Sequence, residues 1–343
     1  MINFLKKTGF ILLIPVSFNT IAQTAAKNYK AIDAYVQKLG SLDSLNMGTI
    51  AAIVTKPFTD KKDKARAIFD WIAYNISFDT KAGRTANTQK NSVTEVLLYR
   101  KAVGIGYASL FQDMCSSANI RCLTADGFIK TNAEQVEDTK TEINHSWAVV
   151  QLGQSPEEWF YVDPTFGSGY TDADYKIFTK SFNDAYFFAD KTIFNLQHYP
   201  DNEAWKLGPA PKSKKDFYAL PLIRSAAYEF KLTGLYPPNG RIHLQARKLQ
   251  TLGFKLDSAA IISKVTLLIQ EHKKSRQENV IYSVDKGLIN ITCKFDQSGS
   301  YPVTVVVNGK ELVTYMVEVE YPLSISPRRG EEMEKNLTMI NTW

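Results

Sequence analysis

The hydrophobic period of this 343-residue chain changes along its length, and that change limits the folds that it can adopt. In the first third, apolar residues recur at helical spacing, as at Ile68, Trp71, Ile72 and Ile76. From about residue 121 the period becomes two, which is typical of half-buried strands. The length favours about two domains. We therefore expect an α+β protein, with a mixed domain over 27–220 followed by strands alone.

The segment KAVGIGYASLF (101–111) is open to more than one interpretation. Apolar residues continue after it at helical spacing as far as Met114, which predicts a buried helix over 104–117. A dinucleotide-binding loop would need a preceding strand and a third glycine. Here a helical pattern precedes the glycines, and Ser109 occupies the third position. We therefore predict that this segment forms the start of a helix.

Three strands are predicted over 121–130, 145–152 and 158–164. If the last two pair about the turn GQSPE, with Trp147 facing Tyr161, then His145 faces Asp163. A carboxylate there would orient the imidazole as the acid does in a nucleophile–His–acid triad. The alternative is a core histidine whose hydrogen bonds are satisfied.

The chain beyond residue 225 shows only strand patterns and turn signals, which predicts an immunoglobulin-like β-sandwich over 225–322. Asn308-Gly309 between two apolar runs predicts a tight hairpin. The polar segment 323–343 is expected to be a flexible tail.

The N-terminus has the order of a secretory signal peptide. Lys6 and Lys7 precede the apolar run 9–18, and Thr20 and Ala22 supply the small residues at a cleavage site. We expect residues 1–22 to be removed and the protein to be exported to the periplasm or the cell exterior, with no transmembrane span remaining.

The charge and the cysteine content argue against two classes of function, nucleic-acid binding and metal binding. The formal net charge of +6 falls by two without the signal peptide and is not clustered, which argues against nucleic-acid binding. Cys115, Cys122 and Cys293 show no zinc-site spacing, and neither a metal nor another cofactor is expected. Cys115 and Cys122 could form a disulfide, although burial as small apolar residues is the preferred interpretation.

Several ordered motifs resemble the transglutaminase-like superfamily, in particular its bacterial and kyphoscoliosis-peptidase-like branch, which has a papain-like fold. The motifs are KARAIFDWIAYNISFD (64–79), VLLYRKAVGIGYASLFQDMCSSANI (96–120), NHSWAVVQL (144–152), WFYVDPTFGSG (159–169) and NLQHYPDNEAWKL (195–207).

The resemblance implies roles for individual residues. The family's nucleophilic cysteine begins the central helix, where unpaired N–H groups stabilise a thiolate. Gly104 occupies the matching position here, while His145 matches the general base and Asp163 the orienting acid. Ser109 lies on another helix face, and Cys115 lies roughly 16 Å along the axis, so neither replaces the thiol.

The cleft implied by the resemblance would be lined by Gly104, Gly106, Tyr107, Asn144 and Trp147. His198 matches a family motif far from the triad and is interpreted as structural, while His243 and His272 lie in the β region with no acid or thiol at a meaningful spacing. We expect an inactive relative that binds a protein or peptide, or serves as a scaffold, in association with the cell envelope. Two alternatives stay open: an active cysteine-type peptidase or protein-glutamine acyltransferase with an unidentified nucleophile, and a purely structural envelope component.

Overall fold

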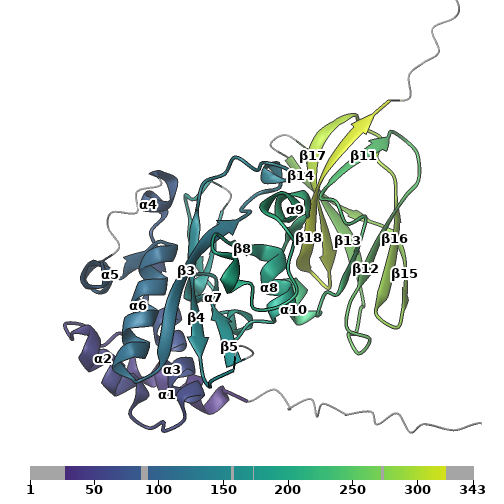
Figure 1. The fold of residues 1–343 in the computed structure, drawn as a ribbon. Helices are drawn as coiled ribbons and strands as arrows, with labels where there is room; N and C mark the ends of the chain where they lie inside the picture. The colour runs from purple at the N-terminus through teal and green to yellow at the C-terminus, as the bar shows by residue number, and fades with distance from the viewer. Residues whose placement is uncertain (1–27, 86–91, 156–157, 173, 272–273, 322–343) are drawn as a thin grey trace, which may run out of the picture.

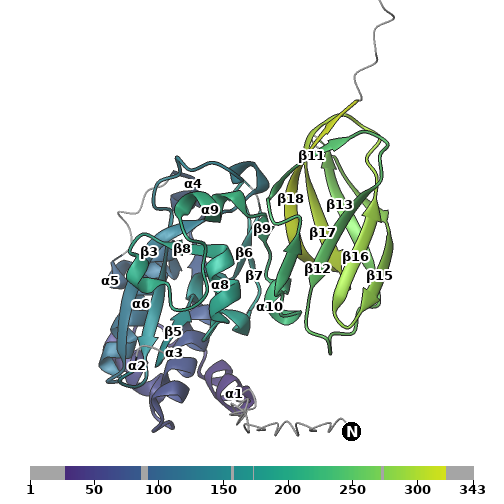
Figure 2. The same ribbon diagram turned by 45° about the vertical axis from the view of Figure 1, so that its right-hand side comes forward.

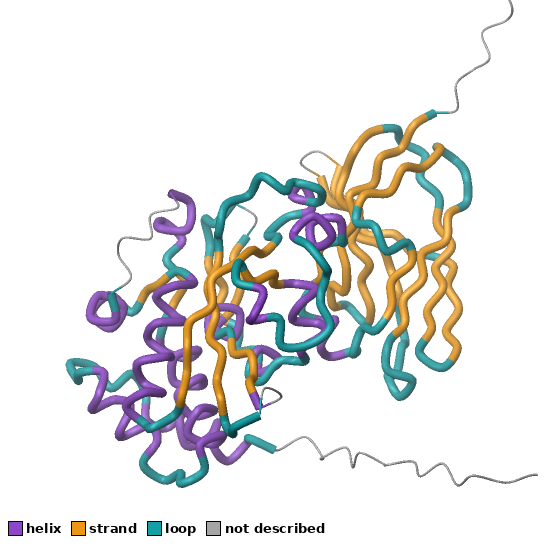
Figure 3. Tube along the Cα trace, in the orientation of Figure 1, coloured by secondary structure: helices purple, strands orange, loops and turns teal. Residues whose placement is uncertain are grey.

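The computed structural model describes residues 28–85, 92–155, 158–172, 174–271 and 274–321. Its helices gather in the N-terminal part and its larger sheets in the C-terminal part (Figures 1 and 3), which confirms the predicted α+β class. The proposed signal peptide (1–22) and tail (323–343) lie outside the described residues. Among the described residues, no helix is long and apolar enough to cross a membrane.

Several helices of the N-terminal part begin at side chains that cap them. Asn46, Asp60 and Ser92 each accept hydrogen bonds from the first turn of the helix that follows. The helices are α1 (Lys30–Leu39), α2 (Met47–Thr55), α3 (Lys61–Asn75), α4 (Thr80–Thr85), α5 (Val93–Tyr99), α6 (Gly104–Ser117), α7 (Pro164–Ser168), α8 (Lys191–Gln197), α9 (Lys214–Ala219) and α10 (Ala226–Glu229). The predicted helix over 104–117 is confirmed by α6.

An antiparallel sheet supports α6 (Figure 1). Its strand order is β5-β4-β3-β8, with β3 (Arg121–Ile129), β4 (His145–Gln151), β5 (Trp159–Val162) and β8 (His198–Pro200). Helix α6 packs on β3 and β4 and buries Tyr107 and Phe111, while Trp147 of β4 is buried in the same core cluster. The beginning of α6 therefore faces the end of β4 at which His145 lies.

The C-terminal part forms two sheets that face each other in Figure 2, as expected for a β-sandwich. One has the order β10-β12-β16-β15 and the other β11-β18-β17-β13-β14. Their bounds are β10 (Gly234–Tyr236), β11 (Arg241–Gln245), β12 (Gln250–Lys255), β13 (Val265–Glu271), β14 (Lys274–Asn279), β15 (Ile281–Asp285), β16 (Leu288–Cys293), β17 (Gly299–Val307) and β18 (Lys310–Glu320). Asn308 and Gly309, with φ of 50° and 82°, form the predicted hairpin.

Short elements complete the chain. Strand β9 (Leu222–Ile223), between the two predicted domains, pairs with β18 and so links the two parts. The parallel pair β1 (Ser77–Phe78) and β2 (Lys101–Ala102) leads into α6, and β6 (Gly169–Thr171) pairs with β7 (Phe178–Lys180).

Candidate functional site

The site begins at the first residue of α6. Val103 precedes the helix in an extended conformation, and Gly104 follows as a buried residue. A Cβ atom built on Gly104 would lie 2.7 Å from Nδ1 of His145 and 3.1 Å from the backbone nitrogen of Ser146. The start of α6 therefore abuts the imidazole directly, without an intervening side chain.

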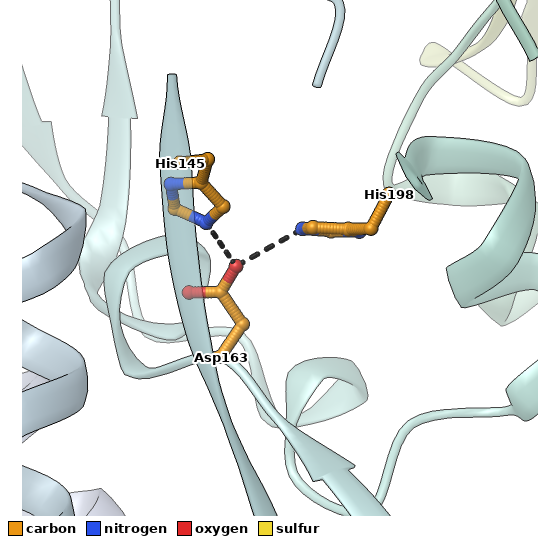
Figure 4. Close-up of side chains that lie close together, drawn as sticks. All are labelled: His145, Asp163 and His198. Atoms are coloured by element: carbon orange, nitrogen blue, oxygen red, sulfur yellow. Dashed lines mark hydrogen bonds and ion pairs between the residues drawn. The ribbon is translucent and has the colours of Figure 1, made fainter. Parts of the chain in front are cut away.

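His145 and Asp163 form a buried hydrogen-bonded pair (Figure 4). His145 is the first residue of β4 and lies opposite Gly127 of β3. Its Nε2 is 2.7 Å from Oδ2 of Asp163. The other carboxylate oxygen, Oδ1, accepts hydrogen bonds from the backbone N–H groups of Thr165 (2.9 Å) and Phe166 (3.1 Å), and so caps α7. The cap fixes the carboxylate and directs Oδ2 toward the imidazole.

The contact forms in a different register from the predicted one. Strands β4 and β5 pair with Val149 opposite Tyr161 and Gln151 opposite Trp159, a shift of two residues from the predicted pairing of Trp147 with Tyr161. The prediction that His145 and Asp163 face each other in the ladder is therefore wrong. Asp163 reaches the imidazole because the chain leaves β5 and turns into α7, so that its side chain is set by the helix cap.

A second imidazole completes the site, and the sequence interpretation of His198 as a residue far from it is wrong. Nε2 of His198 lies 3.1 Å from the same Oδ2 of Asp163 (Figure 4). His198 begins β8, which pairs with the end of β3 beside Gly127. Its ring stacks on Phe194 with centroids 3.9 Å apart. No local pattern marks His198, because β8 joins the sheet across a long stretch of chain; only its place in the resembling motif 195–207 could have signalled a role.

We call these three side chains the His–Asp–His cluster. Burial alone would raise the pKa of the Asp163 carboxyl, but the two imidazoles outweigh burial and hold that pKa well below its usual range. Burial lowers the pKa of His198, against the opposing effect of Asp163. The carboxylate is therefore ionised at neutral pH. The cluster offers three ligand atoms that all lie within 4.8 Å of one another.

The residues expected to line a cleft are placed differently. Tyr107 and Trp147 are fully buried core side chains, so their assignment to an open cleft is wrong. The hydroxyl of Tyr107 donates to the backbone oxygen of Ile76. Gly106 is buried within α6. Asn144 is exposed, and its amide exchanges hydrogen bonds with the backbone of Ile129 rather than with the cluster.

The three cysteines of the chain are free thiols, and all are buried. Burial, with a further effect of the adjacent Cys122, raises the pKa of Cys115 well above its usual value. Cys122 lies opposite Val150, five residues along β3 from the pair Gly127–His145 and hence roughly 17 Å away. Cys293 belongs to β16 of the sandwich. None of these thiols is placed to meet the His145 imidazole.

Of the remaining histidines, His272 lies outside the described residues. His243 is exposed in β11, and its Nδ1 lies 2.9 Å from Oε2 of Glu318. The expectation that no acid accompanies His243 is wrong, because β18 pairs with β11 and brings Glu318 alongside. The pair lies in the sandwich, outside the His–Asp–His cluster.

Part of the chain matches a known protein family, and longer stretches match individual known proteins. Residues 48–164 match the family model of the transglutaminase-like superfamily. The chain is 28% identical over 262 residues to the kyphoscoliosis peptidase of Mus musculus, covering 76% of this chain and 38% of that protein. It is 26% identical over 298 residues to the kyphoscoliosis peptidase of Homo sapiens, covering 87% of this chain and 43% of that protein.

The chain thus spans less than half the length of these two relatives. Among solved structures, one described as a crystal structure of a TGase is 16% identical to this chain, with a TM-score of 0.27. The match covers 43% of this chain and 35% of that structure's chain. The family match over 48–164 includes the start of α6, His145 and Asp163. Residues 48–164 therefore match a domain of the transglutaminase-like superfamily.

Proposed function

We propose that the chain is a catalytically inactive member of the transglutaminase-like superfamily, which binds a protein or peptide or serves as a scaffold. The observation that carries the proposal is the contact between Gly104 and His145. Acyl transfer through a thioester needs a sulfur beside the general base. At the start of α6 the imidazole stands against a backbone that has no side chain.

The retained parts support a binding role. His145 and Asp163 are held by a hydrogen bond, a helix cap and a second imidazole, although the residue beside them offers no nucleophile. The β-sandwich adds a second surface for protein contacts.

For the cellular location, we propose export and cleavage after Ala22. The proposal is based on the N-terminal sequence, in which charged, apolar and small residues follow one another in the order found in signal peptides.

Four proteins test the loss of chemistry: the native chain, His145→Ala, Gly104→Cys, and Gly104→Cys combined with His145→Ala. Each is treated with a thiol-directed acylating probe, and the modified residue is located by mass spectrometry. We expect no His145-dependent labelling of the native chain. Labelling of any native residue that disappears in the His145→Ala single variant would show an overlooked nucleophile and overturn the proposal.

A random peptide library selected on the immobilised native chain tests the binding role. We expect enriched peptides whose affinity falls at least tenfold in the folded variant His145→Ala and is unchanged in His243→Ala, which alters an exposed histidine of the sandwich. Enriched peptides that bind both variants equally would show that the peptide-binding site does not include His145.

Export is tested separately by expressing the chain in a bacterium and sequencing the N-terminus of the periplasmic product, which should begin at Gln23.

A further inference from the structure

We propose that the His–Asp–His cluster binds one divalent transition-metal ion of the zinc class. His145, Asp163 and His198 come from three separate elements and converge within 4.8 Å through ligand atoms. All three are buried. This inference goes beyond the proposed function and does not depend on it, since metal binding needs neither a peptide ligand nor the absence of catalysis.

The carboxylate is oriented as a metal ligand. Oδ1 of Asp163 is already engaged by two backbone N–H groups at the start of α7. Oδ2 is thereby left facing the two Nε2 atoms, at 2.7 Å from His145 and 3.1 Å from His198. A carboxylate whose second oxygen is fixed by hydrogen bonds is typical of ligand shells in metalloproteins.

The two nitrogens of His198 provide an independent argument. Nε2 faces Oδ2 of Asp163, while Nδ1 lies 3.3 Å from the backbone oxygen of Phe194. A neutral imidazole has one N–H, so it cannot donate to both acceptors. A cation between Nε2 and Oδ2 satisfies both atoms and leaves Nδ1–H to donate to the Phe194 oxygen. A backbone carbonyl on the far nitrogen of a ligating histidine is a common feature of zinc sites.

The donor set selects the class of ion. Two imidazole nitrogens and one carboxylate oxygen suit Zn²⁺, Co²⁺, Ni²⁺ or Cu²⁺, whereas Ca²⁺ and Mg²⁺ prefer all-oxygen sites. With bonds of about 2.0–2.1 Å, tetrahedral ligand atoms lie roughly 3.3 Å apart. The contact between His198 and Asp163 is already near that separation. The contact between His145 and Asp163 must widen by about half an ångström, with a small turn of the ring.

The proposal is tested on the untagged full chain after removal of metals with a chelator. Isothermal titration with ZnCl₂ should show one site per chain. CoCl₂ should give the visible absorption of a tetrahedral complex, and Zn²⁺ should abolish it. Affinity should fall at least tenfold in His198→Asn and in Asp163→Asn. The control His243→Asn should bind as the native chain does, because His243 and Glu318 form the other described His–carboxylate pair.

Each variant is first shown to fold by circular dichroism and cooperative unfolding. His198→Cys keeps a ligating atom and should retain Co²⁺ binding with a shifted spectrum. X-ray absorption of the zinc-loaded native chain requires no variant and should show two imidazole nitrogens in the first shell. The proposal is overturned if the native chain shows no stoichiometric site, if a folded His198→Asn binds zinc as tightly as the native chain, or if the first shell contains fewer than two imidazoles.

Discussion

A β-carbon built on Gly104 would lie 2.7 Å from Nδ1 and 3.1 Å from Cε1 of His145. Separations below 3.0 Å are essentially never seen for real β-carbons, so any larger residue at position 104 requires the ring to move. The ring can move only by stretching or breaking its hydrogen bond to Asp163, which holds its opposite nitrogen at 2.7 Å. The observed position of the His145 imidazole therefore requires glycine at position 104.

Gly104→Ala is expected to destabilise the protein through His145. The added methyl group must displace the imidazole from Asp163, and overpacking of this kind costs about 1–3 kcal/mol in the free energy of unfolding. The measurement is urea unfolding of four proteins: the native chain, each single variant, and the double variant with His145→Ala. In the His145→Ala background the cost of Gly104→Ala should largely disappear.

The control for this cycle is Gly48→Ala in helix α2, where the nearest atom to an added Cβ is 3.6 Å away. Alanine there should be neutral or stabilise the helix by up to about 1 kcal/mol. An equal cost of Gly104→Ala with and without the His145 imidazole would contradict the steric coupling.

Asp163 serves two functions that substitutions can separate. Asp163→Asn keeps an oxygen that caps α7 but removes the charge that the two imidazoles face, and should cost about 1–3 kcal/mol. Asp163→Ala also removes the cap and should cost about 0.5–2 kcal/mol more. Both are measured by chemical unfolding. Asp190, which is exposed and caps α8 in the same way, is the matched control: Asp190→Asn should change stability by less than about 0.5 kcal/mol.

The parts of the fold that were predictable from sequence depend on local patterns. Helix α6 follows from apolar spacing within one segment, and the hairpin at Asn308-Gly309 follows from a dipeptide that accepts positive φ. The approach of His145 to Asp163 was also anticipated, although by a ladder register that does not form.

What could not be predicted depends on contacts between distant segments. His198 reaches Asp163 only because β8 pairs with β3, and no spacing within residues 195–200 encodes that partner. Helix α2 was missed because MGTIAAIVT is apolar almost throughout and shows no amphipathic period. The segment 226–229 was read as strand but forms α10, a single turn too short to leave a periodic pattern.

Because Lys130 is buried, we expect it to make the free energy of unfolding depend on pH. Burial lowers its pKa from 10.5 to about 7, although its ammonium donates to the backbone oxygen of Phe217 at 2.5 Å. Between about pH 7 and 10.5 the unfolded chain therefore holds a proton that the folded chain has released. The free energy of unfolding contributed by this group rises with pH across that window, by at most about 1.4 kcal/mol per unit.

Urea unfolding of the native chain and Lys130→Met at pH 7, 8 and 9 measures this contribution as a difference, which cancels the titration of other groups. We expect Lys130→Met to be relatively most stable at pH 7 and to lose that advantage by pH 9. Lys214→Met, which removes a neighbouring ammonium from the ring of Phe128, should leave the slope unchanged. Parallel stability curves for the native chain and Lys130→Met would contradict the prediction.

Gly127→Ala should separate the second imidazole from the cluster. A Cβ at Gly127 would collide with the backbone oxygen of Tyr199 and lie 2.7 Å from Cη2 of Trp147 and 2.9 Å from Cα of Pro200. Strand β8, which begins at His198, must therefore move away from β3. The expected cost is at least about 1–3 kcal/mol, since two of the three clashes involve backbone atoms.

The distinguishing measurement is the imidazole NMR spectrum of the folded variant, in which the His198 resonances should shift more than those of His243. Gly253→Ala in β12 is the control, because the nearest atom to its added Cβ is 3.4 Å away, an ordinary contact. Gly127→Ala could instead unfold at the same denaturant concentration as the native chain and leave the His198 resonances unchanged. In that case the position of β8 would not depend on its close approach to Gly127. A shift confined to His198 would show that one missing side chain in β3 positions the second imidazole against Asp163.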